Sequence, residues 1–298
     1  MPMKQYPVNT LQLKNGETIA YREAGKGDKT ILLIHGNMSS SVHWQPLMEA
    51  LEGEYRMVAP DMRGFGDSSY HKPFDSLREL ADDMREVSEQ LGLKEFTAIG
   101  WSTGGGVVLE MAADMPGIMN KALLLDSVPP TGYPMYKKDA QGRPILSEPL
   151  QTKEDISTDP VQVAPVLAAY AAGNRDMLRF IWNASIYNMN QPSPEDYELY
   201  LDAIFRQRNL VDIDYSLMTF NMTDTPTQFA PGSGRLKDIK CPVVLLHGEK
   251  DLVVPLAWAQ AAQAQIEGSR LITFPEAGHS VLTDDLKLFA DTVRKELE

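Results

Sequence analysis

The sequence contains one cysteine, no surplus of positive charge and no long apolar run, and each shortage excludes a class of protein. Cys241 alone cannot form an internal disulfide, which favours a reducing compartment. The formal net charge of −13 repels phosphate backbones and anionic lipids, so we expect no nucleic-acid partner. No segment reaches the roughly 20 apolar residues of a membrane helix, and the N-terminus lacks the apolar core of a secretory signal. We therefore expect a cytoplasmic protein without integral membrane contact, whose oligomeric state the sequence does not indicate.

What the sequence does contain suits one large globular domain, with 298 residues of which 43% are apolar. An antiparallel hairpin is expected over 11–22, because two alternating runs flank Asn15-Gly16, a pair typical of a two-residue turn. A helix is expected over 76–91, opened by Ser76 and Glu79 at capping-box spacing and ended by Gly92. Short apolar strands are expected at 31–34, 57–59, 96–99, 122–125, 243–246 and 270–274, with further helices at 105–115, 194–208, 256–265 and 286–297.

Uniformly apolar strands that alternate with helices predict a mostly parallel sheet covered on both faces. The alternation stops between 128 and 231, where the chain is rich in Pro, Met and aromatic residues and carries helical pieces. We therefore expect an α/β core formed by 1–127 and 232–298, and a helical cap formed by 128–231 that is inserted after the sixth strand.

The strongest chemical signal is Gly100-Trp101-Ser102-Thr103-Gly104, which joins an expected strand to an expected helix. A serine hydroxyl is a weak nucleophile, so it must be exposed on a sharp turn beside a base. Ser102 is the predicted nucleophile. The backbone N–H of Thr103, at the start of the helix, and that of Asn37, in the turn after the strand at 31–34, are the predicted oxyanion donors.

The base is sought among five histidines, which are His35, His43, His71, His247 and His279. His279 follows the last expected strand in a Gly-containing loop, which can bring its imidazole over the carboxyl edge of the sheet. His35 and His247 each end a buried strand and are interpreted as structural, whereas His43 and His71 are expected to face solvent. His279 is therefore the predicted base.

The acid must hold that imidazole in one tautomer and stabilise its protonated form. Asp251 follows a strand and precedes His279 in the chain, so it is the favoured candidate. Asp126, at the end of the strand at 122–125, remains an alternative, and Glu249 is a third.

No other motif calls for a cofactor. The Gly-containing stretch at 61–68 lacks the lysine and spacing of a phosphate-binding loop and is interpreted as a structural turn. No group of His, Cys, Asp or Glu has the spacing of metal ligands along the chain, so neither a metal nor a cofactor is expected.

Taken together, HGN at Asn37, DMRGFGDS ending at Ser68, GWSTG at Ser102, GEKDLVVP at Asp251 and AGHS at His279 resemble the α/β-hydrolase superfamily. The resemblance implies an eight-stranded sheet, a Ser102–Asp251–His279 triad and an acyl-enzyme mechanism. The GWS elbow, the cap length and the missing secretion signal also look like the intracellular poly(3-hydroxybutyrate) depolymerases of bacilli. That likeness implies a polyester substrate on storage granules, whereas the superfamily as a whole implies a small-molecule substrate.

The leading hypothesis is a serine-dependent carboxylic-ester hydrolase. A lactonase or carbon–carbon bond hydrolase with the same triad, and a signalling receptor that keeps the triad, are the alternatives. Aromatic and methionine side chains of the cap are expected either to line an acyl pocket or to form the core of the cap; these are Tyr133, Tyr136, Trp182, Tyr187, Met189 and Phe220.

Overall fold

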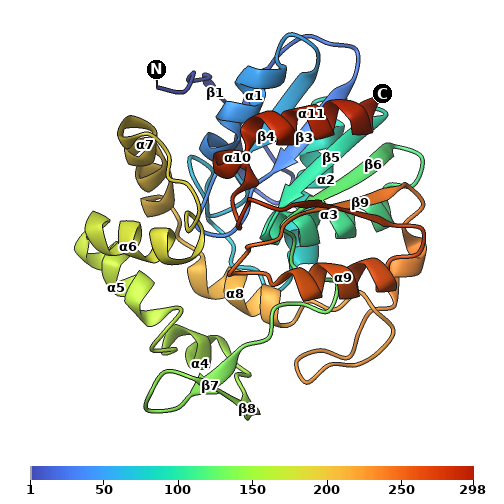
Figure 1. Cartoon of the computed structure of the whole chain (residues 1–298). Coiled ribbons are helices and arrows are strands. Elements are labelled where there is room, and N and C mark those ends of the chain that lie inside the picture. Colours follow the sequence, from blue (N-terminus) through green and yellow to red (C-terminus); the bar gives the residue numbers. More distant parts are fainter. Residues whose placement is uncertain (1) are drawn as a thin grey trace.

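The computed structural model describes residues 2–298 and contains an eight-stranded, mostly parallel sheet (Figure 1). The strand order is β1-β2-β4-β3-β5-β6-β9-β10. The first pairings, β1 with β2 and β2 with β4, are antiparallel, and all the others are parallel. The strands are β1 (Val8–Gln12), β2 (Thr18–Ala24), β3 (Thr30–Ile34), β4 (Arg56–Pro60), β5 (Phe96–Trp101), β6 (Met119–Leu125), β9 (Val243–Gly248) and β10 (Arg270–Phe274).

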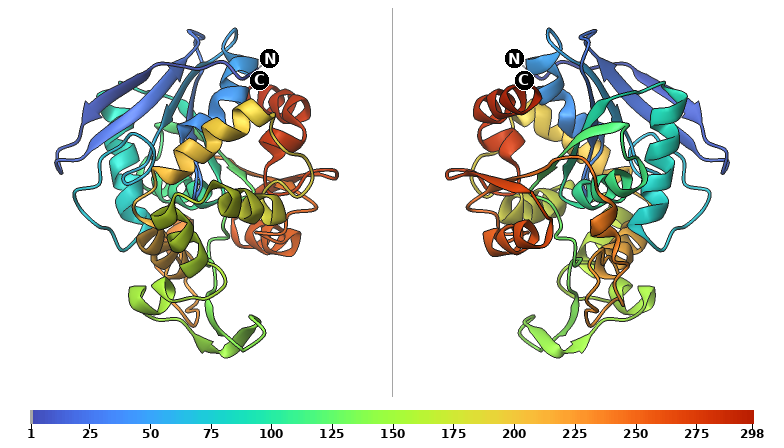
Figure 2. Two further views of the ribbon diagram at one scale, coloured as in Figure 1. Left: turned by 90° about the vertical axis from the view of Figure 1, so that its left-hand side faces the viewer. Right: turned by 90° about the vertical axis from the view of Figure 1, so that its right-hand side faces the viewer.

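Helices cover both faces of this sheet because its central strands are apolar on both sides (Figure 2). In β3, Ile31 and Leu33 join one apolar cluster, whereas Leu32 and Ile34 join the other. The first cluster includes α1 (Gln45–Leu51) and α11 (Leu286–Leu297), and the second includes α2 (Leu77–Gln90), α3 (Thr103–Asp114) and α9 (Leu256–Gln265). The predicted fold class is therefore confirmed.

Between β6 and β9 the chain leaves the sheet, as the sequence predicts, and its described residues form five α-helices and a short 3-10 helix at Arg235–Asp238. The α-helices are α4 (Lys153–Ser157), α5 (Ala164–Ala172), α6 (Arg175–Ser185), α7 (Pro194–Phe205) and α8 (Leu210–Met218). The segment also holds an unpredicted hairpin, β7 (Tyr136–Lys138) with β8 (Pro144–Pro149), which protrudes at the end of the molecule away from both termini (Figures 1 and 2). Its strands are short and mostly exposed, so they lack the apolar alternation that reveals a strand in a sequence.

The opening hairpin is present, but its predicted two-residue turn is wrong. Gly16 has a positive φ of 93°, whereas Asn15 does not. The Leu13 N–H donates to the Glu17 carbonyl at 2.8 Å and the Gly16 N–H donates to the Leu13 carbonyl, which leaves a three-residue loop. The Asn15 side chain donates to Asp83 and accepts from the Glu17 N–H, so it serves side-chain hydrogen bonds rather than a tight turn.

The predicted helices agree with the structure except at their ends. Ser76 caps α2 by accepting from the Glu79 N–H, but the Glu79 carboxylate accepts from Asp75 rather than completing the capping box. Helix α3 begins at Thr103, directly after the elbow serine, and α7 ends at Phe205, three residues earlier than predicted. The early start of α3 matters for the site, because it places the first helical N–H groups beside Ser102.

Candidate active site

Ser102 occupies a strained turn between β5 and α3, with φ 54° and ψ −118°. A residue other than glycine adopts this backbone region at a cost of about 1–3 kcal/mol. Glycines on both sides make the turn feasible. A Cβ on Gly100 would lie 2.3 Å from the Gly104 carbonyl oxygen, and one on Gly104 would lie 2.3 Å from the Ile34 carbonyl oxygen. The G-x-S-x-G spacing is therefore a requirement for close backbone packing at the elbow.

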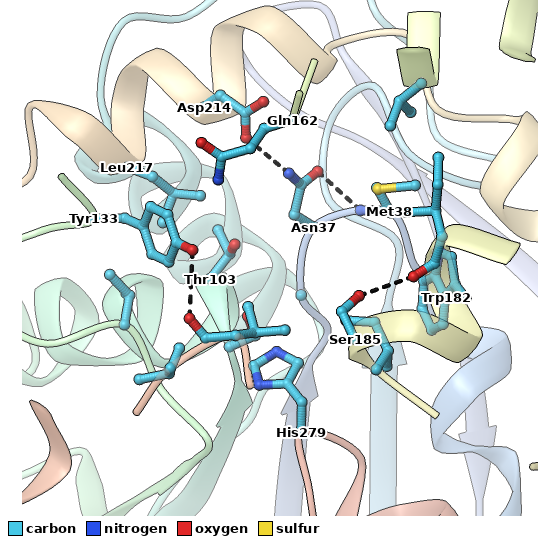
Figure 3. A pocket seen from close by; sticks show the side chains of 18 of the residues that line it. Asn37, Met38, Thr103, Tyr133, Gln162, Trp182, Ser185, Asp214, Leu217 and His279 are labelled. Atoms are coloured by element: carbon cyan, nitrogen blue, oxygen red, sulfur yellow. Dashed lines mark hydrogen bonds between the residues drawn. The ribbon is translucent and has the colours of Figure 1, made fainter. Parts of the chain in front are cut away.

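Ser102 and His279 line the same cavity, which has a volume of about 350 Å³. Figure 3 shows His279 in the wall of this cavity. Asn37 and Thr103 line it as well, so the structure brings four of the five predicted site residues to one cavity wall. The hydrogen bonds formed among residues 2–298 do not include one between Ser102 Oγ and His279 Nε2. A hydrogen bond between a nucleophile and its base often tightens only when substrate is bound.

Two backbone N–H groups are available for an oxyanion. Within the described residues 2–298, the N–H groups of Asn37 and Thr103 donate to no protein acceptor. Asn37 is held by its side chain: its Oδ1 accepts from the Met38 N–H and from Gln207, and its Nδ2 donates to Asp214 at 2.9 Å. The loop that presents the first donor is thus fixed by contacts to the segment between β6 and β9.

The predicted acid and base lie within hydrogen-bonding distance of each other. His279 Nδ1 and Asp251 Oδ2 are 2.7 Å apart, and both side chains are buried. The other oxygen of Asp251 accepts from the N–H groups of Val253 and Val254. Burial alone would raise the pKa of the Asp251 carboxyl, but His279 and these hydrogen bonds hold it below its ordinary value. The Trp101 indole N–H donates to the His279 carbonyl at 2.8 Å and fixes the loop.

The two alternative acids form no hydrogen bond with His279. Asp126 is fully buried, and its Oδ1 accepts from the Gly248 N–H at 2.8 Å, whereas its Oδ2 has no hydrogen-bond partner among residues 2–298. Burial, together with the charge of Asp251, raises the pKa of Asp126 well above its ordinary value. Glu249 is exposed and accepts from the Thr273 hydroxyl. Only Asp251 of the three is positioned to orient the imidazole.

The remaining histidines are structural or exposed, but one prediction among them is wrong. His35 accepts from the Met62 N–H, and His247 donates to the Val254 carbonyl, so both serve local hydrogen bonds. His71 is exposed, as predicted. His43 is buried, not solvent-facing, because helices of the segment between β6 and β9 cover it.

The His43 ring stacks on Tyr200 with centroids 4.4 Å apart and also approaches Trp182. Burial, followed by the neighbouring His35, lowers the pKa of His43 to about 3. Its neutral ring therefore serves as part of an aromatic core rather than as an acid or base at ordinary pH.

The structure also assembles a group that spacing along the chain does not reveal. Ligand-type atoms of Asp126, His247 and Asp251 lie within 4.8 Å of one another, and all three residues are buried. Asp126 accepts from Gly248, His247 donates to Val254 and Asp251 contacts His279, so the group adjoins the His279–Asp251 pair. The turn at 61–68 is structural, as predicted, with Asp61 accepting from Ser41 and from the Asp67 N–H.

The cavity wall differs in part from the predicted set. Tyr133 and Trp182 line it, whereas Tyr136, Tyr187, Met189 and Phe220 do not. Tyr187 and Phe220 are instead buried among apolar residues. Sequence reasoning missed the polar wall formed by Gln162, Ser185 and Asp214, because no periodicity of the chain shows which polar residues of an inserted segment face inward.

A strained serine elbow, two available N–H groups and His279, which is paired with buried Asp251, thus meet at one cavity. The chain belongs to the alpha/beta hydrolase fold family, whose model matches residues 29–286. Among residues 2–298, no helix is long and apolar enough to cross a membrane.

Relatives and solved structures agree with this assignment. The chain is 30% identical over 295 residues to a bifunctional esterase/perhydrolase of Acinetobacter calcoaceticus, covering 95% of this chain and 96% of the relative. It is 27% identical to a non-heme haloperoxidase of Rhodococcus erythropolis, covering 95% of each. An esterase from Exiguobacterium antarcticum shares the fold with a TM-score of 0.75 at 21% identity, covering 97% of this chain and 98% of that one. These comparisons support the superfamily but not the finer resemblance to poly(3-hydroxybutyrate) depolymerases.

Proposed function

We propose that this protein is a serine-dependent hydrolase of carboxylic esters, with Ser102 as nucleophile, His279 as base and Asp251 as the acid that orients it. The observation that carries the proposal is the His279–Asp251 pair, 2.7 Å apart, at the cavity that Ser102 also lines. The Asn37 and Thr103 N–H groups bind the oxyanion.

The chemistry proceeds in two halves. Ser102 Oγ bonds to the ester carbonyl carbon while its proton passes to His279 Nε2, and the carbonyl oxygen becomes an oxyanion held by the two N–H groups. The intermediate collapses, the bond to the leaving alkoxide breaks, and His279 returns the proton to that oxygen. Water then attacks the acyl-enzyme, gives its proton to His279, and the acid leaves as Ser102 regains its hydrogen.

The cavity favours a small substrate. Its volume of about 350 Å³ lies at the lower end of the range for small-molecule sites, and apolar side chains form much of its wall. We propose that the chain divides into a core of 1–127 and 232–298 and a cap of 128–231, since residues of the latter supply more than half of the cavity lining. The cap then selects the substrate while the core supplies the catalytic groups.

The experiment that tests this proposal compares wild type with Ser102→Ala on a series of p-nitrophenyl esters of increasing acyl length. We expect rapid turnover of short esters by wild type and a near-complete loss in the variant. Undiminished turnover by Ser102→Ala would remove the mechanism. Turnover by wild type as slow as that of a stoichiometric binder would favour the receptor alternative.

Two further arms address the finer substrate. Amorphous poly(3-hydroxybutyrate) tests the hypothesis of a polyester substrate, which implies a cytoplasmic protein located at storage granules. Simple lactones test the lactonase alternative. An enol-lactonase from Burkholderia xenovorans shares the fold with a TM-score of 0.74 at 16% identity. Acid release from the polymer at a rate comparable with the best small ester would establish a polyester substrate.

A further inference from the structure

The cavity wall contains one carboxylate that the proposed mechanism does not use. Asp214 is the only Asp or Glu among the described residues that line the cavity, and that lining includes no Lys or Arg. It lies on α8, and Figure 3 shows it beside Gln162 and Asn37, with His279 on the other side of the cavity. An acidic group in a largely apolar wall is costly unless something polar binds it.

The partners of Asp214 leave part of its hydrogen-bonding capacity unused. Its Oδ1 accepts from Asn37 Nδ2 at 2.9 Å, and among residues 2–298 its other oxygen accepts no hydrogen bond. A carboxyl group has about four lone-pair positions, so several remain. Lys138, which donates to Gln162 Oε1 at 3.2 Å, is paired with Asp159 at 2.8 Å, and no salt bridge to Asp214 is formed among residues 2–298.

Gln162 completes a polar patch beside Asp214. Its Oε1 accepts from Lys138, and its backbone N–H donates to Asp159, which orients the residue. The side-chain amide therefore presents its N–H groups as donors, while Asp214 presents an acceptor. A group that both donates and accepts matches this pair.

We infer that Asp214, with Gln162, recognises a hydroxyl group on the substrate, so that the preferred esters carry an alcohol on the part that enters the cavity. A hydroxyl donates to Asp214 when the carboxyl is ionised and accepts from it when the carboxyl is protonated. A carboxylate on the substrate is compatible only with the protonated form, and an ammonium group only with the ionised form. This inference rests on the proposed ester hydrolysis and specifies its substrate class.

Asp214 could instead serve only to hold Asn37, and the isosteric Asp214→Asn separates the two roles. Asparagine keeps an oxygen that accepts from Asn37 Nδ2, but it lacks the carboxyl group offered to the substrate. Asp212→Asn, on the same helix, is the matched control, because Asp212 pairs with Lys153 and Tyr70 and does not line the cavity.

The experiment measures kcat/KM for methyl esters that carry a hydroxyl at the third to sixth carbon of the acyl chain, each paired with the same ester without it. A second series, monoacetates of diols paired with alkyl acetates, places the hydroxyl on the alcohol side. At about pH 8.5, above the Asp214 pKa of about 7, we expect for at least one position that the ratio of hydroxyl to unsubstituted ester falls about tenfold in Asp214→Asn, because an NH2 group replaces the acceptor oxygen of a half-buried carboxylate. The ratio should stay unchanged in Asp212→Asn.

Equal ratios in wild type and Asp214→Asn at every position of both series would overturn the inference, as would an equal loss on both members of each pair. If Asp214→Asn does not fold, Asp214→Ser also removes the carboxyl group, and the ratio within each ester pair cancels the accompanying loss of the Asn37 contact. If neither variant folds, a wild-type preference for the unsubstituted ester at every position refutes the inference. Absence of any ester hydrolysis by wild type would instead refute the proposed function, so the two failures are distinguishable.

Discussion

His279 Nδ1 lies 2.7 Å from Asp251 Oδ2, whereas Asp126, one strand away, accepts its hydrogen bond from the Gly248 N–H. Both carboxyl groups are buried, but only that of Asp251 contacts the imidazole of His279. Burial, and then the charge of Asp251, raises the pKa of Asp126 well above its ordinary value.

Asp251→Asn and Asp126→Asn should thus differ sharply in activity. We expect Asp251→Asn to lower kcat by about 10⁴-fold, because an amide favours the wrong tautomer of His279. Asp126→Asn keeps an oxygen for the Gly248 N–H and should lower kcat by less than about tenfold. Side-by-side kinetics on one short ester decide the point, and the reverse order of the two effects would make Asp126 the acid.

The strained backbone at Ser102 is expected to lower the stability of the protein, while the Ser102 hydroxyl is needed for activity. Ser102→Ala is expected to lower kcat by about 10⁴-fold or more while keeping the strained backbone. Ser102→Gly removes the nucleophile and tolerates the positive φ of 54°, so it should be about 1 kcal/mol more stable than Ser102→Ala. Urea denaturation of the two inactive variants measures the difference, and an equal free energy of unfolding would show that the elbow stores no strain.

Gly104 should be far less tolerant of a methyl group than Gly53. A Cβ on Gly104 would lie 2.3 Å from the Ile34 carbonyl oxygen, whereas one on Gly53 would meet nothing within 4 Å. Gly104→Ala is expected to lower the free energy of unfolding by about 1–3 kcal/mol, because backbone must move to accommodate it. Gly53→Ala should stay within about 0.5 kcal/mol of wild type. Matching thermal midpoints for the two variants would contradict this account of the elbow.

The stability of wild type relative to Asp214→Asn should depend on pH. Burial, and then the negative charge of Asp159, raises the pKa of Asp214 from 3.8 to about 7, although the Asn37 hydrogen bond opposes the shift. The folded protein therefore holds this proton more tightly than the unfolded chain does. The stability that the proton provides is lost as the pH rises from the unfolded pKa through the folded one.

We therefore expect wild type to lose free energy of unfolding, relative to Asp214→Asn, between about pH 4 and pH 8, with no further change above that range. Urea midpoints of both proteins across this range provide the measurement. A difference that is constant with pH would show that Asp214 is ionised in the folded protein throughout.

The sequence by itself determined the catalytic candidates and the sheet, because both depend on short, contiguous patterns of residues. The uniformly apolar runs that became β3, β5, β6 and β9 indicate a buried parallel sheet, and G-x-S-x-G marks its elbow. His279 is predicted from its place after the last strand. The topology of a parallel sheet brings the residues that follow its strands close to one another at one edge.

Only the tertiary structure decided which carboxylate faces His279 and which side chains form the cavity wall. Asp126 and Asp251 both follow strands at the same sheet edge, and their hydrogen bonds, to Gly248 for Asp126 and to Val253, Val254 and His279 for Asp251, distinguish their orientations. The burial of His43 and the inward position of Asp214 depend on how the helices between β6 and β9 fold over the core. Such packing is a sum of contacts between residues distant in the chain, and no local pattern of the sequence records it.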